Sequence, residues 1–267
     1  MSKFNIPKNK STKKILNFFK LKNLDEILKN LDNQKRPENQ MRWYKTLAPD
    51  LNDLYRLYQF IFLNKRTTIL EFGTGWSTLI MGIAINDVKN KYYTEFKKLN
   101  LRRHNPFEVF TLDTSKKYLN ISKKRILKIK KNIISKVNYC HSDAKMDIYD
   151  GKYVSIYNKL PNCNPDFIYI DGPDPFMVKG KVNNFNQAHG DLMPMSADIL
   201  KIEYYLTPGT IILLDGRTAN ARFLKDHFKR KWKYQHDKIN DQHYFYLDDK
   251  PLGNVNERQL KFYDLAK

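Results

Sequence analysis

The sequence predicts an α/β fold of three layers, doubly wound, in which helices cover both faces of a mostly parallel seven-stranded sheet. Five short apolar runs rich in strand-forming residues alternate with stretches whose apolar residues follow helical spacing. Four of these runs end directly in glycine or aspartate, which commonly stop strands at turns. Residues 233–239 and 242–247 are two further strand-like runs across an Asn-Asp pair, which predicts a terminal antiparallel β-hairpin.

The composition is that of a folded protein with a strong excess of positive charge. Of the 267 residues, 41% are hydrophobic and 13% aromatic, which is enough for a full core and excludes a disordered chain. The 48 basic and 28 acidic residues give a net charge of +20. This charge favours nucleic acid, an anionic membrane surface or an acidic substrate as a partner, without selecting among them. A compositional habit of the source genome explains it equally well.

Two amphipathic helices are predicted ahead of the sheet, over residues 11–33 and 51–62, with a polar segment at 33–40 between them. Lysines flank the apolar face of the first helix, which is compatible with peripheral membrane contact, but packing on the main domain is the commoner use of this pattern. We therefore expect an N-terminal helical extension (1–63) that packs on a main domain (64–248), followed by a C-terminal tail (249–267) without an assigned element.

The main domain alternates between strands and helices. Its elements follow in order as strand 67–72, glycine turn and helical stretch 79–85, polar basic insertion 86–106, strand 109–112, basic helix from Ser115 to about 135, strands 137–140 and 166–170, helix 196–206, and strand 210–214. In an open sheet of this kind, ligands bind at the carboxyl ends of the strands. Residues at those ends are the candidates for function.

The cysteines and the apolar segments indicate a reducing compartment. Cys140 and Cys163 are too few for a disulfide framework and lack the spacing of a zinc site. The most apolar long stretch, residues 67–85, contains a glutamate and glycines, and the N-terminus lacks the apolar run of a signal peptide. We expect a soluble, cytoplasmic protein without a transmembrane segment.

The turn after the first strand favours a cationic ligand. Gly73 and Gly75 follow the strand, but Ser77 stands where a dinucleotide-binding fingerprint has its third glycine. Glu71 lies at the strand end, where it would repel a pyrophosphate and attract a cation. An NAD(P)-dependent oxidoreductase therefore remains an alternative that these residues disfavour. S-Adenosylmethionine carries both a sulfonium and an ammonium group.

This motif resembles that of the class I S-adenosylmethionine-dependent methyltransferases, a Rossmann-like family. An acidic residue, one spacer and Gly-x-Gly match the family's first motif at Glu71, Gly73 and Gly75, and Trp-Ser follows, as in the O-methyltransferase-like branch. The resemblance extends over roughly residues 55–248 and includes the terminal hairpin. It implies S-adenosylmethionine as the cofactor.

The resemblance also implies a role for each cofactor-binding residue. Gly73 and Gly75 let the backbone approach the methionine part of the cofactor, and Glu71 lies near its ammonium. The remaining roles are contact of Ser77 with the cofactor carboxylate, acceptance of both ribose hydroxyls by Asp113, and contact of Asp143 with the adenine amino group. The alternative roles of the two aspartates are a helix N-cap and an exposed loop position.

Two carboxylates at strand ends are candidates for chemistry. The resemblance puts Asp171 beside the transferred methyl group, where it positions or deprotonates the acceptor; His189 is a second candidate base. Asp171 and Asp215 are the expected ligands if the protein binds a divalent metal, as in metal-dependent O-methyltransferases. That subfamily has Asn or Asp after the second aspartate, whereas Gly216 stands here, which argues against the metal.

The expected acceptor is a hydroxyl or other heteroatom of a small molecule or sugar-type compound. Residues 173–195 are expected to form the acceptor-binding loop, and Arg217 and Arg222 suit an anionic acceptor. The runner-up function is nucleic-acid binding or methylation, since residues 116–136 carry nine basic residues and no acids. Against it, no Asn-Pro-Pro-Tyr-like tetrapeptide follows the fourth strand. The oligomeric state is not predictable from these features.

Overall fold

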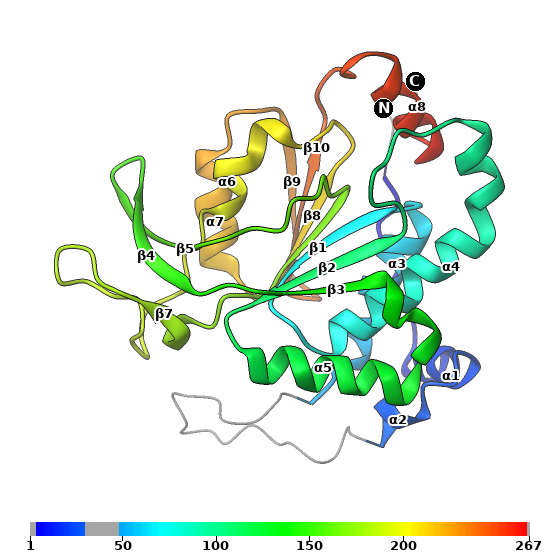
Figure 1. The fold of residues 1–267 in the computed structure, drawn as a ribbon, viewed down its shortest axis with the longest axis horizontal. Helices are drawn as coiled ribbons and strands as arrows, with labels where there is room; N and C mark the ends of the chain where they lie inside the picture. The colour runs from blue at the N-terminus through cyan, green and yellow to red at the C-terminus, as the bar shows by residue number, and fades with distance from the viewer. Residues whose placement is uncertain (1–3, 30–47, 266–267) are drawn as a thin grey trace.

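Seven strands form the main sheet in the order β3-β2-β1-β6-β8-β10-β9 in the computed structural model, which describes residues 4–29 and 48–265 (Figure 1). The strands are β1 Thr68–Phe72, β2 Glu108–Asp113, β3 Val137–His141, β6 Phe167–Ile170, β8 Ile211–Asp215, β9 Trp232–Asp237 and β10 Gln242–Leu247. All neighbours are parallel except at β10, which runs antiparallel to both β8 and β9. The predicted fold class, including the terminal hairpin, is confirmed.

Helices cover both faces of this sheet, as Figure 1 shows. They are α1 Thr12–Leu21, α2 Asp25–Leu28, α3 Leu51–Leu63, α4 Trp76–Lys98, α5 Lys116–Ile129, α6 Asp198–Ile202, α7 Thr218–His227 and α8 Gly253–Phe262, with short 3-10 turns at Lys131–Lys136, Pro175–Met177 and Glu203–Tyr205. One apolar core lies between the sheet and a set of six helices, α1, α2, α3, α4, α5 and α8. The other joins α6 and α7 to the opposite face.

Helix α4 is longer than the sequence indicates. We expected helical structure over residues 79–85 and a polar insertion over 86–106, but the helix continues to Lys98. Val88 and Phe96 are buried on its inner side, while the lysines between them lie outside. These few apolar residues at helical spacing are thus enough to anchor the inner face of α4 in the core. The long separation between the glycine turn and β2 is therefore mostly helix.

A second, small sheet is built from two strands between β3 and β6 in the chain and one after β6, where the sequence analysis assigned no strands. It consists of β4 Ala144–Tyr149, β5 Lys152–Tyr157 and β7 Val178–Lys179 in the order β5-β4-β7. Asp150 and Gly151 form the turn between β4 and β5, both at positive φ (48° and 70°). This is the Asp-Gly turn that two-residue hairpins favour. The sheet extends away from the main one at the left of Figure 1.

The N-terminal helices contact the main sheet's helical layer. Phe18 of α1 packs edge-on against Tyr55 and Tyr58 of α3, and Lys22 pairs with Asp87 of α4 at 2.6 Å. The predicted polar segment 33–40 lies outside the described residues.

The chain after Asp248, which had no assigned element, contains α8, whose Phe262 is fully buried. None of the helices described is both long enough and apolar enough to span a membrane.

Candidate active site

The turn from β1 to α4 combines one glycine that the backbone requires with one whose position would accommodate a Cβ. Gly73 has φ +97°, and a Cβ there would lie 3.2 Å from the backbone of both Asp171 and Gly172. Gly75 is extended, and a Cβ there would meet no atom nearer than 3.6 Å, the Ser77 Oγ. A side chain is therefore excluded at Gly73 by the fold, whereas its absence at Gly75 leaves room beside the turn.

Glu71 holds this turn in place from beneath. It is fully buried, and its carboxylate accepts hydrogen bonds from the hydroxyls of Ser77 at 2.5 Å and Thr78 at 2.7 Å. Burial raises the pKa of Glu71 to about 7, although these hydroxyls lower it. The carboxylate thus joins the end of β1 to the first turn of α4. The Ser77 hydroxyl donates to Glu71, so its proton is not free for a ligand carboxylate.

Asp113 ends β2 next to this turn, because Leu112 pairs with Phe72 and accepts from the Gly73 amide at 2.8 Å. One carboxylate oxygen of Asp113 accepts from the Ser115 amide at 2.6 Å. Burial raises the pKa of Asp113 to about 6. Ser115 itself caps α5, accepting from a backbone amide of the first turn at 3.2 Å. The alternative role of Asp113 as the cap is therefore taken by Ser115.

Asp143 lies farther along the same edge, between β3 and β4. Its carboxylate pairs with Lys179 of β7 at 2.9 Å, and 39% of its side chain is exposed. The hydrogen bond from Lys179 lowers the pKa of Asp143. Asp143 is therefore a charged, accessible acceptor whose position depends on the small sheet.

Asp171 follows β6, and its backbone is fixed from two sides. Its amide donates to the Phe72 carbonyl at 2.9 Å, while Nη2 of Arg217 donates to the carbonyls of Asp171 at 2.5 Å and Pro173 at 3.1 Å. The Asp171 side chain is 59% exposed. Arg217, expected to hold an anionic acceptor, thus bridges the loops after β6 and β8. Its side chain is 10% exposed, and Nη1 has no partner among the described residues.

Asp215 ends β8 and has an acidic neighbour that sequence reasoning missed. Burial, followed by the charges of Asp53 and Asp171, raises the pKa of Asp215 to about 8. Burial and the charge of Asp50 likewise raise the pKa of Asp53, in α3, to about 7. Asp50 caps α3, accepting from the Asp53 amide at 3.1 Å. An Asp-x-x-Asp helix start is visible in the sequence, but its proximity to β8 depends on tertiary packing.

His189 is not joined to these carboxylates. Its side chain is 63% exposed, its Nδ1 accepts from the Asp191 amide at 3.2 Å and lies 3.9 Å from the Asp191 carboxylate. In the described part of the chain, no hydrogen bond or ion pair links His189 to Asp171 or Asp215. The position of His189 relative to Asp171 and Asp215 depends on the loop that carries it, which the sequence alone does not predict.

The two predicted metal ligands lack a third. Among the described residues, the one group of three potential ligands with donor atoms within 4.8 Å of one another is His236, Asp241 and His243, and it includes neither Asp171 nor Asp215. Gly216 supplies no side-chain oxygen. The residues present at the predicted pair therefore do not form a recognisable divalent-metal site.

The histidine group is poorly arranged for a cation as well. The rings of His236 and His243 stack with centroids 3.9 Å apart and 19° between planes, so their nitrogens do not converge on one point. Both nitrogens of His243 are within 2.9 Å of a hydroxyl, from Thr218 and Tyr234. This arrangement is a packed hydrogen-bonded cluster.

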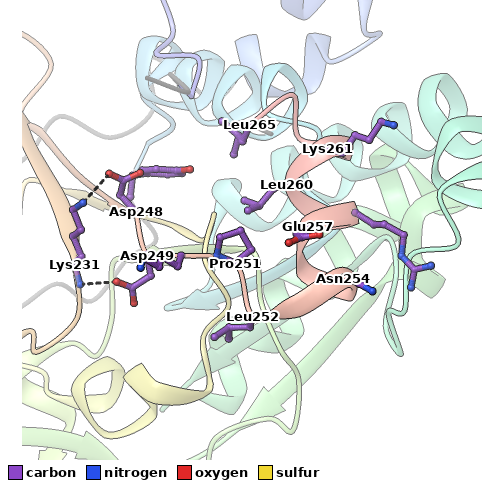
Figure 2. A pocket seen from close by; sticks show the side chains of 13 residues that line it. Lys231, Asp248, Asp249, Pro251, Leu252, Asn254, Glu257, Leu260, Lys261 and Leu265 are labelled. Carbon is purple, nitrogen blue, oxygen red and sulfur yellow. Dashed lines mark hydrogen bonds and ion pairs between the residues drawn. The ribbon is translucent and has the colours of Figure 1, made fainter. Parts of the chain in front are cut away.

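A large hollow lies away from this edge. It measures about 1060 Å³ and is enclosed by α8 and the end of β10. Figure 2 shows Leu252, Leu260 and Leu265 on one side of it and Lys231 near Asp248 and Asp249 on the other. None of the predicted site residues lines it. The chemistry of the strand ends, and not the size of a hollow, locates the candidate site.

The strand ends together form an acidic edge on a basic protein. Carboxylates from four strands and α3 converge there: Glu71, Asp113, Asp171, Asp215 and Asp53. The chain as a whole carries +20. This local reversal of charge favours a cationic ligand at this edge.

No family model matches the chain, and no curated protein matches it. Solved structures to which the chain is similar include cofactor-bound Rv0187 from MTB, at 11% identity over 91% of this chain and 100% of that one, with a TM-score of 0.46.

Another is the O-methyltransferase TomG from Streptomyces achromogenes, involved in tomaymycin synthesis and solved with S-adenosylmethionine, at 11% identity over 91% of this chain and 92% of that one, with a TM-score of 0.40. A third is a methyltransferase from Geobacter sulfurreducens, at 8% identity over 91% of each chain, with a TM-score of 0.41. With identities of 8–11% and TM-scores of 0.40–0.46, these likenesses assign neither a family nor a function to this chain.

Proposed function

We propose that the protein is an S-adenosylmethionine-dependent methyltransferase that binds its cofactor across the ends of β1 and β2. One observation carries the proposal: a buried Glu71, an open Gly75 and a partly buried Asp113 lie on adjacent strand ends. S-Adenosylmethionine needs cationic and diol recognition in the same place, and carboxylates supply both. A pyrophosphate cofactor would meet only repulsion there.

Each residue has a proposed part in holding the cofactor. The methionine part lies against Gly73 and Gly75, where Gly75 leaves space. Asp113 accepts from the two ribose hydroxyls, and Asp143 accepts from the adenine amino group beside Lys179. Because Glu71 is buried, we propose that its charge attracts the cofactor ammonium without direct contact. Ser77, whose hydroxyl donates to Glu71, belongs to the same turn.

The proposed reaction is an in-line displacement. A lone pair of the acceptor forms a bond to the methyl carbon while the carbon–sulfur bond breaks, and S-adenosylhomocysteine leaves. The protein must align the acceptor and receive its proton. Asp171, fixed between Phe72 and Arg217, is our candidate for both tasks, and His189 is the second candidate for the proton.

The proposed acceptor is a hydroxyl or other heteroatom of a small molecule. O-Methylation suits this edge because, besides the candidates Asp171 and His189, it holds Asp53 and Asp215, whose pKa values are raised to about 7 and about 8 and which can also accept a hydroxyl proton near neutrality. The unpartnered Nη1 of Arg217 is the donor we propose for an acidic group on the acceptor. No step requires a metal.

A thermal-shift comparison tests the cofactor. S-Adenosylmethionine, S-adenosylhomocysteine, NAD and NADP are each added well above their expected dissociation constants. At about one hundred times Kd, a ligand stabilises the folded state by about 2.7 kcal/mol, a shift of roughly 5 °C for a chain of this size. We expect this shift with the two S-adenosyl ligands alone. A shift with NAD or NADP instead, or with none of the four, would overturn the proposal.

A further inference from the structure

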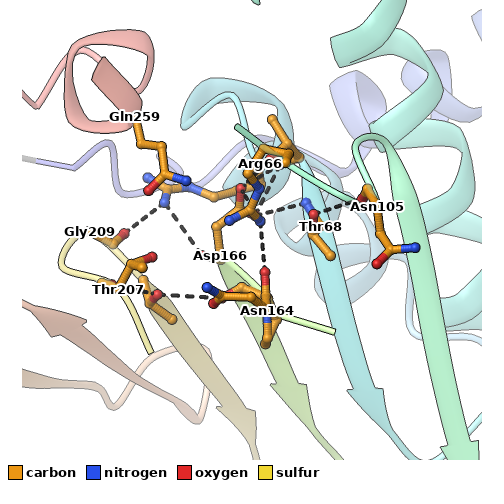
Figure 3. Close-up of polar contacts among 12 residues, drawn as sticks. Arg66, Thr68, Asn105, Asn164, Asp166, Thr207, Gly209 and Gln259 are labelled. Atoms are coloured by element: carbon orange, nitrogen blue, oxygen red, sulfur yellow. Dashed lines mark hydrogen bonds and ion pairs between the residues drawn. The ribbon is translucent and has the colours of Figure 1, made fainter. Parts of the chain in front are cut away.

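A buried carboxylate organises the amino edge of the sheet, at the opposite end of the strands from the candidate active site (Figure 3). Asp166, fully buried, directly precedes β6. It accepts from the amides of Thr67 at 2.9 Å and Thr68 at 3.0 Å, and from the Tyr263 hydroxyl at 2.7 Å. Nη2 of Arg103 lies 3.4 Å from the same carboxylate. The oxygens of Asp166 are therefore fully engaged.

Arg66 is a buried cation at this edge, and two of its three guanidinium nitrogens have no partner among the described residues. Its side chain is fully buried, and Nη1 donates to the Gly209 carbonyl at 2.7 Å. Nε and Nη2, which form one edge of the guanidinium, have no partner among the described residues. Burial lowers the pKa of Arg66, and the charge of Asp166 only offsets this. A buried donor edge without an acceptor costs free energy of folding.

The buried charges at this edge are unequal. Arg66 and the Arg103 side chain, 3% exposed, share Asp166 as their buried carboxylate. Arg102 and His104 lie beside them on the surface, and within the described ranges neither has a hydrogen-bond or ion-pair partner. The neighbouring acid Glu108 is occupied by side-chain amides, including that of Asn105 at 3.2 Å. The edge thus carries more positive charge than its own carboxylates balance.

A small hollow of about 70 Å³ opens among these groups. Arg102, Arg103, His104 and Gln259 line it, and none of its lining residues is acidic. Figure 3 shows Gln259 and Asn164 on either side of Arg66 and Asp166. Since one water molecule needs roughly 10 to 15 Å³ of such a hollow, the space suits several waters or one tetrahedral oxyanion.

We propose that this hollow is an oxyanion-binding site that takes inorganic phosphate or the phosphate group of a larger molecule. Guanidinium groups present a planar fork of donors that matches the oxygens of phosphate, and Arg102 and Arg103 both line the space. The His104 ring adds a donor from the surface side. The site lies at the other edge of the sheet from the cofactor and acceptor sites and does not depend on them.

Calorimetric titration with inorganic phosphate tests the proposal, with ionic strength held constant by sodium chloride. We expect one site per chain and a loss of affinity of about tenfold or more in Arg102→Gln/His104→Gln, since charge-assisted hydrogen bonds are removed. Both side chains are exposed and without partners, so the fold is retained, which circular dichroism checks. The control Lys98→Gln/Lys124→Gln removes two exposed positive charges elsewhere and should bind as the wild type does.

Glycerol phosphate in the same titration separates the two sources of the anion. Tighter binding than that of inorganic phosphate indicates the phosphate group of a larger molecule, and weaker binding indicates the free ion; either supports the site. Absence of binding heat with both ligands would overturn the proposal, as would an equal loss of affinity in the Lys98/Lys124 control. Binding of S-adenosyl ligands should be unchanged in both double variants, whatever the outcome of the cofactor test.

Discussion

The two edges of the main sheet differ in how far the protein compensates the charge of buried carboxylates. At the amino edge, Asp166 is surrounded by amides, a hydroxyl and Arg103, so its charge is fully compensated by the protein. At the carboxyl edge, burial and neighbouring carboxylates raise the pKa values of Asp53 and Asp215, so their charges are poorly compensated. A compensated carboxylate contributes to stability, whereas crowded ones gain from a cationic ligand. This difference supports a structural role for the Asp166 carboxylate and the proposed cofactor site at the carboxyl edge.

The largest effect should follow removal of the compensated carboxylate. Asp166→Ala leaves Arg66 and Arg103 buried without their shared partner and should lower the free energy of unfolding by about 3 to 5 kcal/mol. Urea denaturation measures this change. Asp226→Ala, an exposed position in α7, is the control and should stay within about 0.5 kcal/mol. A loss below about 1 kcal/mol at Asp166 would contradict the structural role of that edge.

The two glycines of the β1 turn should separate stability from binding. Gly73→Ala forces an L-residue to φ +97° against the loop backbone and should cost about 1 to 3 kcal/mol of unfolding free energy. Gly75→Ala meets no close atom, so the fold should keep its stability within about 0.5 kcal/mol.

The same Gly75→Ala change should weaken S-adenosylmethionine binding by about tenfold, since the methyl group fills the proposed cofactor space. Denaturation and calorimetry on both variants test the pair. If Gly75→Ala destabilises the fold as much as Gly73→Ala does, or binds the cofactor normally, the open space beside the turn is not a binding site.

The pH dependence should have opposite signs for stability and binding. Glu71, Asp53 and Asp215 have pKa values near 7, 7 and 8 in the folded protein, raised from ordinary values of 4.5, 3.8 and 3.8. Between the unfolded and folded values the folded state binds more protons, so these groups make stability fall as pH rises from about 5 to about 8. Binding of the cationic cofactor should tighten over the same range, because the carboxylates become charged.

Melting temperature and cofactor affinity measured across that range check both signs. A ligand-free stability that rises steadily up to about pH 8, or an affinity for S-adenosylmethionine that falls, would contradict the view that the carboxyl edge holds uncompensated acids.

The smallest effect is expected at Asp143. Its pair with Lys179 is largely exposed, so Asp143→Ala should change the unfolding free energy by less than about 1 kcal/mol. Loss of one hydrogen bond to the adenine amino group should weaken S-adenosylmethionine binding by roughly three- to tenfold. Lys179→Met removes the same ion pair without touching the proposed contact and should leave affinity nearly unchanged. Equal affinities in both variants and the wild type would remove Asp143 from the site.

The strand ends of the main sheet could be predicted because the relevant signals are local. An apolar run closed by an acid or a glycine marks both a strand and its carboxyl end. Parallel pairing then brings neighbouring ends together, and Asp113 lies beside the Gly73 turn for that reason. The fold class followed from the same alternation of elements.

Features that depend on packing between distant segments were not predictable. Asp53 approaches Asp215 only because α3 packs near β8 and the hairpin, and Arg217 reaches Asp171 across two loops. The small sheet was missed although its Asp150-Gly151 turn was visible, because the region of β4 and β5 had no assigned element and β7 lies within the expected acceptor-binding loop. The predicted end of helix α4 was too early because the second half of the helix is mostly polar.

Calorimetric titration of S-adenosylmethionine into the wild type and Asp113→Ala tests the central claim most directly. Asp113 is the proposed ribose ligand, and its loss removes charge-assisted hydrogen bonds worth about 1.5 to 3 kcal/mol each. We predict one site per wild-type chain and an affinity about 10- to 100-fold lower in the variant, with both proteins folded. Equal affinities, or no binding to a folded wild type, would contradict a cofactor site at the ends of β1 and β2.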